Sequence, residues 1–216
     1  MTKRDWEGKE TLGLFKRLTE KPWLPPSRGV TELRTQQFAA HNKRVALVMF
    51  LAIVGVLFSL FIVAYHMRKD FATDWVAAPE PPLLWLNSLV LIIVSLAFEW
   101  SRAAVREEDI ESARRRFYVA GCLTLAFLAG QVIVWVQMLG MGYGMQANPA
   151  NAFFYVITLV HGLHLLGGLI AWIRIAPKLN VDSDCGDVQL GVDLCSLYWH
   201  FLLLVWVAML ALFVSS

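Results

Sequence analysis

Residues 117–173 read FYVAGCLTLAFLAGQVIVWVQMLGMGYGMQANPANAFFYVITLVHGLHLLGGLIAWI and contain no aspartate, glutamate, lysine or arginine. A transmembrane helix needs about 20 mostly apolar residues to cross a bilayer, so this stretch is too long for one helix. Its middle, GMGYGMQANPAN at 140–151, is rich in the glycine, asparagine and proline typical of loops. The stretch therefore predicts two membrane-spanning helices, at 117–139 and 152–173, with Asn151 as the N-terminal cap of the second.

Three more apolar runs lie outside this stretch, at 45–65, 83–101 and 194–214, and the second of them contains a single charge, Glu99. Continuous apolar runs indicate helices, because the strands of a lipid-facing barrel alternate in polarity. We therefore predict an all-α fold, an integral membrane bundle of five transmembrane helices within residues 45–216. A polar arm, residues 1–44, precedes the bundle; its sequence fits a docking segment for a partner subunit and a solvated lead-in equally well.

The composition agrees with a membrane protein and excludes several other classes. Of the 216 residues, 57% are hydrophobic and 17% charged, with a mean hydropathy of +0.54. A soluble domain is about half apolar and about a quarter charged, so the apolar surplus here is expected to face lipid. Disordered, collagen-like and small disulfide-rich chains are excluded. The net charge of +2 gives no reason to expect a nucleic-acid partner. The three cysteines, Cys122, Cys185 and Cys195, lack the spacing of metal ligands.

The distribution of lysine and arginine predicts the orientation in the membrane. Seventeen of the nineteen lie in the arm or in the loops after the second and fourth spans, and only Arg68 and Lys69 lie on the other side. Because basic residues collect on the cytoplasmic side, we expect the N-terminus in the cytoplasm and the C-terminus outside.

Polar residues inside apolar spans are costly in lipid and so point to function or to helix packing. His161 and His164 share one face of the fourth span, and His200 lies in the fifth. Imidazole is a common metal ligand, but His200 is expected nearer the cytoplasmic side than the other two. We therefore favour neutral histidines that hydrogen-bond between helices over a metal site. A complete proton path through this chain is not expected either, because Glu99 lies at the end of its span.

Two histidine motifs carry a resemblance to a known family. Residues 158–168, TLVHGLHLLGG, and the later YWHF at 198–201 with VW at 205–206 resemble subunit III of the haem–copper oxidases, which shows T-G-x-H-G-x-H-V-x-x-G and Y-W-H-F-V-D-x-V-W. Shorter pieces agree in the same order. They are Trp85 and Asn87 in a W-x-N stretch, Phe127, Gln131 and Trp135 in a Q-x-x-E-W-like helix, and Asp193, where the family usually has glutamate.

The chain departs from the family pattern at three acids that the family embeds in the membrane. Val54, Val134 and Leu203 occupy their positions. Any delivery of protons to an oxidase through those acids is therefore not expected here.

The resemblance covers residues 43–216 and implies the short five-helix bacterial form of subunit III. It implies a non-catalytic accessory subunit, in the bacterial inner membrane, of a respiratory haem–copper terminal oxidase that reduces oxygen to water. Such a subunit would pack beside subunits I and II, stabilise subunit I and hold phospholipid, with no cofactor of its own and the haem and copper in the partner. The side chains expected to bind lipid or pack helices are His161, His164, His200, Gln131, Asp193, Trp199 and Asn87.

Two other functions remain open on the sequence. One is the accessory subunit of a nitric oxide reductase, which would share every span and motif. The other is a stand-alone membrane metalloprotein or transporter built on the three histidines. The sequence does not indicate whether an oxidase partner takes electrons from cytochrome c or from quinol.

Overall fold

The computed structural model describes residues 28–71, 75, 81–179 and 185–215, and the chain divides into two compact units, Met1–Asn42 and Lys43–Ser216. Most of the predicted arm, residues 1–27, lies outside the described residues. The described part of the first unit, residues 28–42, is helical. The second unit contains the transmembrane bundle.

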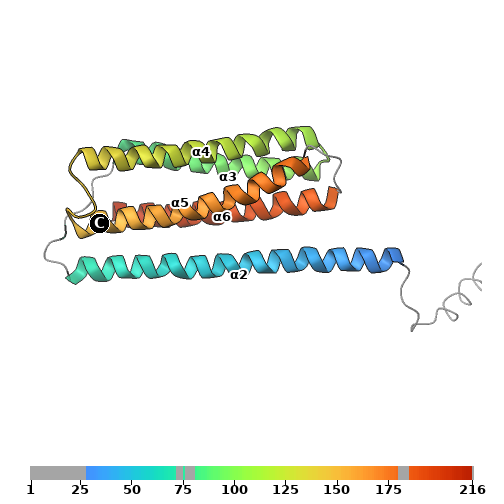
Figure 1. The fold of residues 1–216 in the computed structure, drawn as a ribbon, viewed down its shortest axis with the longest axis horizontal. Coiled ribbons are helices and arrows are strands. Elements are labelled where there is room, and N and C mark those ends of the chain that lie inside the picture. The colour runs from blue at the N-terminus through green and yellow to red at the C-terminus, as the bar shows by residue number, and fades with distance from the viewer. Residues whose placement is uncertain (1–27, 72–74, 76–80, 180–184, 216) are drawn as a thin grey trace, which may run out of the picture. The chain divides into compact units, whose positions relative to one another are not determined.

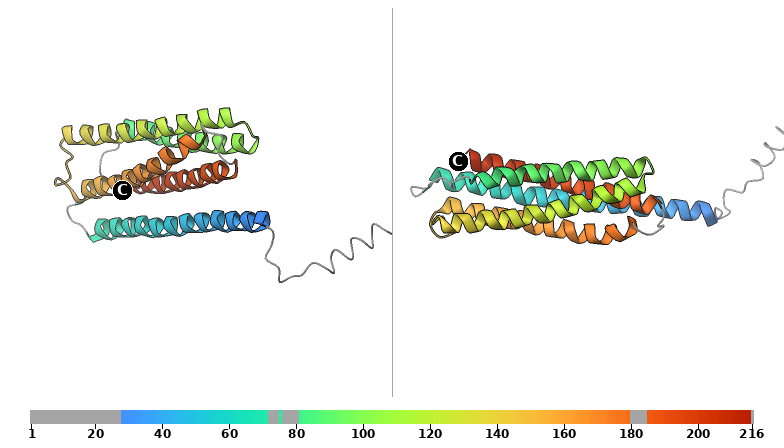
Figure 2. Two further views of the ribbon diagram at one scale, coloured as in Figure 1. Left: turned by 45° about the vertical axis from the view of Figure 1, so that its right-hand side comes forward. Right: turned by 90° about the horizontal axis from the view of Figure 1, so that it is seen from above.

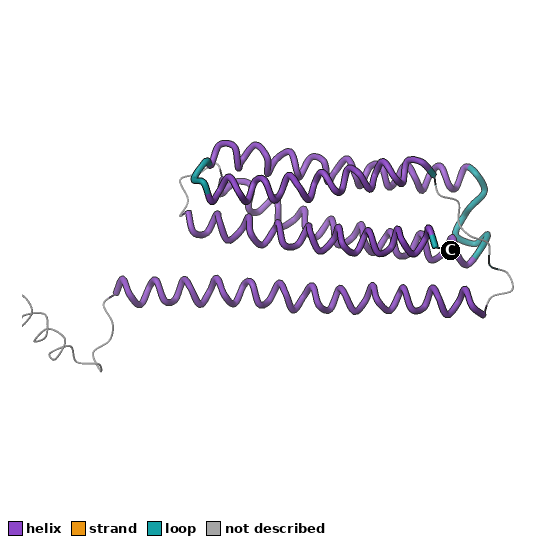
Figure 3. The backbone as a smooth tube through the Cα atoms, turned by 180° about the vertical axis from the view of Figure 1, so that it is seen from behind, coloured by secondary structure: helices purple, strands orange, loops and turns teal. Residues whose placement is uncertain are grey.

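The described residues form helices and short connections, as the sequence predicted (Figure 3). Within the described residues, five helices are long and apolar enough to cross a membrane, which confirms the predicted number of spans. Each helix extends beyond its predicted apolar run, because polar flanking residues also adopt helical structure. The elements are α2 (Arg28–Phe71), α3 (Pro82–Arg106), α4 (Ile110–Gly140), α5 (Pro149–Ile175), the 3₁₀ turn η1 (Ala176–Leu179) and α6 (Cys185–Val214).

The predicted cap of α5 is wrong. Asn148 caps this helix, since its side-chain oxygen accepts a 3.1 Å hydrogen bond from the backbone N–H of Ala150. The reason is Pro149, whose fixed φ and missing N–H suit the first position of a helix, so the cap precedes it. Asn151 lies buried inside the first turn, where its Nδ2 donates to the Gly144 carbonyl at 3.4 Å.

Helices α3 and α4 form a tight antiparallel pair, and α5 and α6 pack beside it (Figure 1). Glycines permit these close approaches. A Cβ atom on Gly130 would clash with the side chain of Asn87 on α3, and one on Gly121 would clash with the indole of Trp172 on α5. The core of the bundle therefore depends on positions where no side chain fits.

The part of α2 in the second unit, residues 43–71, lies along α5 and α6 and meets them through long side chains (Figures 1 and 2). The Phe58 ring lies 5.6 Å from the ring of His164, and the Tyr65 ring lies 6.2 Å from that of Phe213. Near the end of α2, Lys69 Nζ donates to the carbonyl of Ser215 at 3.1 Å. Aromatic rings thus fill the space between α2 and the other helices.

Candidate functional site

The structure separates the predicted site residues into a central group, a groove beside α2 and an ionic cluster. In the centre, His161 is fully buried. Its ring lies 5.2 Å from that of Trp206, 6.2 Å from Phe127 and 6.3 Å from Phe58. Neither of its ring nitrogens has a hydrogen-bond partner among the described residues. His161 therefore packs inside a cage of aromatic rings, and no hydrogen bond to a described residue holds its ring there.

His164 lies one turn along α5 and faces α2. Its Nδ1 donates to the Val160 carbonyl at 2.7 Å, within its own helix. The backbone carbonyl of His164 accepts a 2.7 Å hydrogen bond from the hydroxyl of Tyr198 on α6. With Phe50 and Phe58 against its ring, His164 joins α2, α5 and α6.

Asn87 and Gln131 form a polar contact between α3 and α4. Asn87 Nδ2 donates to the Phe127 carbonyl at 3.3 Å and lies 3.5 Å from Gln131 Oε1. Both side chains are buried, and the Nε2 of Gln131 has no partner in the described part of the chain. This contact explains the glycine at position 130, because the Asn87 side chain occupies the space of a Cβ.

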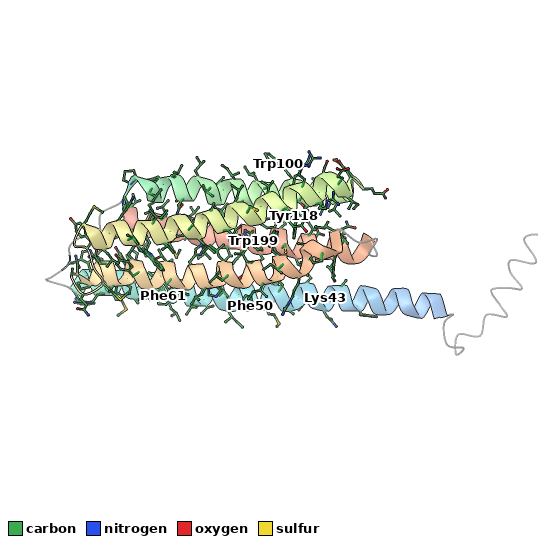
Figure 4. All side chains as sticks on the ribbon, turned by 45° about the horizontal axis from the view of Figure 1, so that its top comes forward. Lys43, Phe50, Phe61, Trp100, Tyr118 and Trp199 are labelled. Atoms are coloured by element: carbon green, nitrogen blue, oxygen red, sulfur yellow. The ribbon has the colours of Figure 1, made fainter. Side chains whose placement is uncertain are left out.

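Trp199 lies within the bundle, whereas Trp100 points outward from α3 (Figure 4). The indole Nε1 of Trp199 donates to Thr124 Oγ1 on α4 at 3.1 Å, and its ring lies 4.4 Å from that of Phe98. Its far edge lies against Gly168 on α5, where a Cβ would come within 2.9 Å. Trp199 thereby ties four helices together.

An apolar groove of about 320 Å³ lies beside Trp199, between α2, α5 and α6. We name it the α2–α5 groove. Gly167 and Gly168 of α5 line one part of it, and Phe50 of α2 lines another. The groove is lined by Leu47, Phe50, Gly167, Gly168, Ala171, Ile175, Leu194, Cys195, Tyr198 and Trp199.

An ionic cluster joins α3 to α6. Arg102 Nε lies 2.6 Å from Asp193 Oδ1, and its Nη1 lies 3.4 Å from both carboxylate oxygens of Glu99. Arg106 lies 3.8 Å from Asp193. His200 Nε2 lies 3.7 Å from Glu99, so the third intramembrane histidine belongs to this cluster.

Two serines complete the hydrogen bonding of the ionic cluster. Ser196 Oγ donates to Glu99 at 2.9 Å, and Ser95 Oγ is hydrogen-bonded to His200 Nδ1 at 3.1 Å. The sequence analysis missed Ser95, Arg102 and Ser196 as members of the site. The spacing of Ser88, Ser95, Glu99 and Arg102 places them on one face of α3, and that pattern could have revealed them.

The three histidines do not converge. His161 and His164 lie together beside Phe58, whereas His200 pairs with Glu99. Among the described residues, no three histidine, cysteine, aspartate or glutamate side chains come together to hold a metal ion.

The positions of the family's embedded acids are part of the packed core. Val54 and Val134 are buried, and Leu203 is partly buried against the same core. Burying an unpaired carboxylate at these positions would cost free energy, whereas burying valine or leucine there does not.

Comparison with known proteins identifies the family. The model of the family described as cytochrome c oxidase subunit III matches residues 40–215. The chain belongs to the cytochrome c oxidase subunit III family. It is 25% identical to cytochrome c oxidase subunit 3 of Thermostichus vulcanus over 170 residues, covering 77% of this chain and 83% of the relative. It is 28% identical to subunit 3 of Synechocystis sp. (76% and 72% covered) and to the probable subunit 3 of Nocardia farcinica (72% and 76% covered).

Family membership and the five spans define the general role. The chain is a multi-pass bacterial membrane protein and an accessory subunit of a respiratory terminal oxidase, working in a complex with other oxidase subunits.

Proposed function

We propose that this subunit packs beside subunits I and II of its oxidase, which carry the haem and copper, and stabilises subunit I during turnover. Its own residues serve packing and lipid binding. The end of the bundle that holds Arg102, Arg106 and Arg174 faces the cytoplasm in this proposal, because basic residues favour that side.

We further propose that the α2–α5 groove holds an acyl chain of a phospholipid. The observation that supports this is the groove itself, an almost wholly apolar recess of about 320 Å³ within the membrane spans. Two glycines and an alanine line it on α5, and the aromatic rings of Tyr198 and Trp199 line it on α6 and fill the space of a Cβ at Gly168. A recess of this kind holds a lipid chain in a fixed place, where a smooth helix surface would let lipids exchange.

A matched pair of substitutions tests the lipid site. Ala171→Leu adds bulk inside the α2–α5 groove, and Ala126→Leu adds the same bulk on an exposed face of α4. We expect Ala171→Leu to lower the amount of phospholipid retained per purified complex and to reduce the number of turnovers before inactivation. Ala126→Leu should change neither quantity. Equal lipid content and equal lifetime in both variants would refute the proposal.

The identity of the partner is tested by a reduced-minus-oxidised visible spectrum of the complex that co-purifies with the tagged chain. A haem a, o or b oxidase spectrum with oxygen uptake supports the proposed function. Haem b and c with nitric oxide turnover would identify a nitric oxide reductase instead. A colourless, partner-free preparation would contradict both.

A further inference from the structure

The side chains of Glu99, Arg102 and Asp193 lie together with His200 on one partly exposed face of the bundle. Along α6, the residues Leu197, His200, Leu204 and Val207 recur at helical spacing and are all exposed; we name them the α6 stripe. Its basic end, at Leu197 and His200, lines the same cavity as Arg44 of α2 and Arg102 of α3. By contrast, residues 45–67 of α2, 117–140 of α4 and 149–173 of α5 contain no aspartate, glutamate, lysine or arginine.

The ionic cluster lies along the edge of this face and is not sealed from its surroundings. The side chains of Glu99 and His200 are 43% and 46% exposed, and those of Arg102 and Asp193 are 29% and 30% exposed. Asp193 and His200 are seven residues apart on α6, which corresponds to about 10 Å along the helix axis. The polar groups therefore extend well into the span from its basic end.

A cavity of about 180 Å³ opens at the basic end of the α6 stripe. Arg44 of α2, Arg102 of α3 and Asp193 of α6 line it, together with leucines of α6. Arg44 pairs with no acidic side chain among the described residues. Together with Arg106, the described side chains of the cavity and the ionic cluster include three guanidinium groups and two carboxylates, Glu99 and Asp193, which leaves one surplus positive charge among them when His200 is neutral.

Hydrocarbon chains cannot solvate these groups, and leaving charge exposed to them is costly. A phospholipid headgroup stays at the interface, whereas the polar groups continue about 10 Å inward to Ser95 and His200. A helix can present apolar side chains to Leu204 and Val207 and a polar one at the matching depth. We propose that the α6 stripe and its cavity form the docking surface for a transmembrane helix of a partner oxidase subunit, which places an aspartate or glutamate between Arg44 and Arg102. This inference rests on the proposed packing beside the catalytic subunits.

The proposed role of the cavity in docking is tested by charge reversal in the intact complex. Arg44→Glu replaces the unpaired guanidinium by a carboxylate, and Arg115→Glu makes the same change on α4, away from this face. We expect Arg44→Glu to lower the recovery of the partner subunit per tagged chain by about tenfold or more, because it places like charges together. Arg115→Glu should leave the recovery unchanged. Equal recovery with the two variants would overturn the proposal.

A photo-reactive benzoylphenylalanine in place of Leu204 tests the same surface without altering charge. Irradiation of the membrane-bound complex should cross-link position 204 to a partner oxidase subunit, and the same probe at Leu166 of α5 should yield none of that product. Cross-links from position 204 only to phospholipid, or only to a second copy of this chain, would overturn the docking surface. In that case, an oxidase that still co-purifies would leave the proposed function intact, whereas a chain purified without any oxidase would contradict both.

Discussion

Helices α3 and α2 are attached to the same bundle in different ways. In the apolar part of α3, 44% of the residues are buried, against 17% in that of α2. Helix α3 approaches α4 closely enough for Asn87 to occupy the space beside Gly130, whereas α2 reaches its neighbours through the rings of Phe50, Phe58 and Tyr65. The difference shows how a small membrane bundle combines a fixed core with recesses, because a helix held by long side chains leaves space on both of its sides.

The two recesses beside α2 differ in chemistry. The α2–α5 groove is almost wholly apolar, whereas the cavity on the α3 side is lined by Arg44, Arg102, Asp193 and His200. The same helix thus separates a surface suited to a lipid chain from one suited to a polar protein partner.

The largest expected effect comes from adding a methyl group where the core is tightest. Gly121→Ala should destabilise the bundle by about 1–3 kcal/mol, since the new Cβ meets the indole of Trp172, which is held by its own hydrogen bond to the Phe117 carbonyl. Gly55→Ala on α2 is the matched control. Its Cβ would lie 3.7 Å from Phe201, an ordinary contact, and alanine favours the helix by up to about 1 kcal/mol.

Unfolding of the detergent-solubilised chain by a denaturing detergent measures both glycine variants. We expect Gly121→Ala to unfold at lower denaturant than the parent and Gly55→Ala at the same or higher denaturant. If the two variants were destabilised equally, α2 would be packed as tightly as the contact between α4 and α5, and the proposed difference in packing between α2 and the core would be wrong.

The membrane spans were predictable from the sequence, and most of the site was not. A helix in lipid must be apolar over its whole length, so runs such as 117–139 can be recognised residue by residue. The partners of His200 could not be recognised in the sequence, because they depend on how α3 and α6 are aligned along each other. Glu99 was expected to lie at the end of its span, but its contacts with Arg102, Ser196 and His200 were not predicted.

Intermediate effects are expected at the histidines between α2 and the core. Because His161 has no hydrogen-bond partner among the described residues, His161→Leu should leave stability unchanged or raise it by about 1 kcal/mol, as it removes an unpaired polar group. His164→Leu should lower stability by about 0.5–1.5 kcal/mol, because it removes ring contacts with Phe50 and Phe58 of α2.

The same denaturation assay, followed by oxidase assembly in membranes, compares the two histidine variants. A loss of several kcal/mol for His161→Leu would show that its ring nitrogens bind something, such as a buried water. No effect of His164→Leu on stability, assembly or turnover lifetime would remove His164 from the residues that attach α2.

The smallest effect is expected in the turn that joins the tight pair α3 and α4. Asp109 caps α4, and its carboxylate accepts hydrogen bonds from Ser112, including one from the backbone N–H at 3.1 Å. These bonds, helped by the nearby Arg116 and Arg115, lower the pKa of Asp109 below its ordinary value. A lowered pKa in the folded state means that the cap stabilises the fold above the unfolded-state pKa. This contribution is lost as the pH falls through the folded-state pKa.

An NMR titration of the Asp109 carboxyl carbon in micelles should therefore give a midpoint below that of a model peptide. The protection of the Ser112 amide from exchange, measured relative to the intrinsic rate at each pH, should fall in acid as the cap becomes protonated. Asp109→Asn keeps a side-chain oxygen acceptor but cannot ionise, so in this variant the exchange of Ser112 should lose that acid-dependent step. Because Asp109 is fully exposed at the end of the bundle, the change should stay local and leave the contact between Asn87 and Gly130 untouched. An Asp109 midpoint at or above the model-peptide value would show that the α3–α4 turn is not held by this cap, and that contacts such as the packing of Asn87 against Gly130 and the hydrogen bond from Ser101 to the Ala113 carbonyl keep the two helices together.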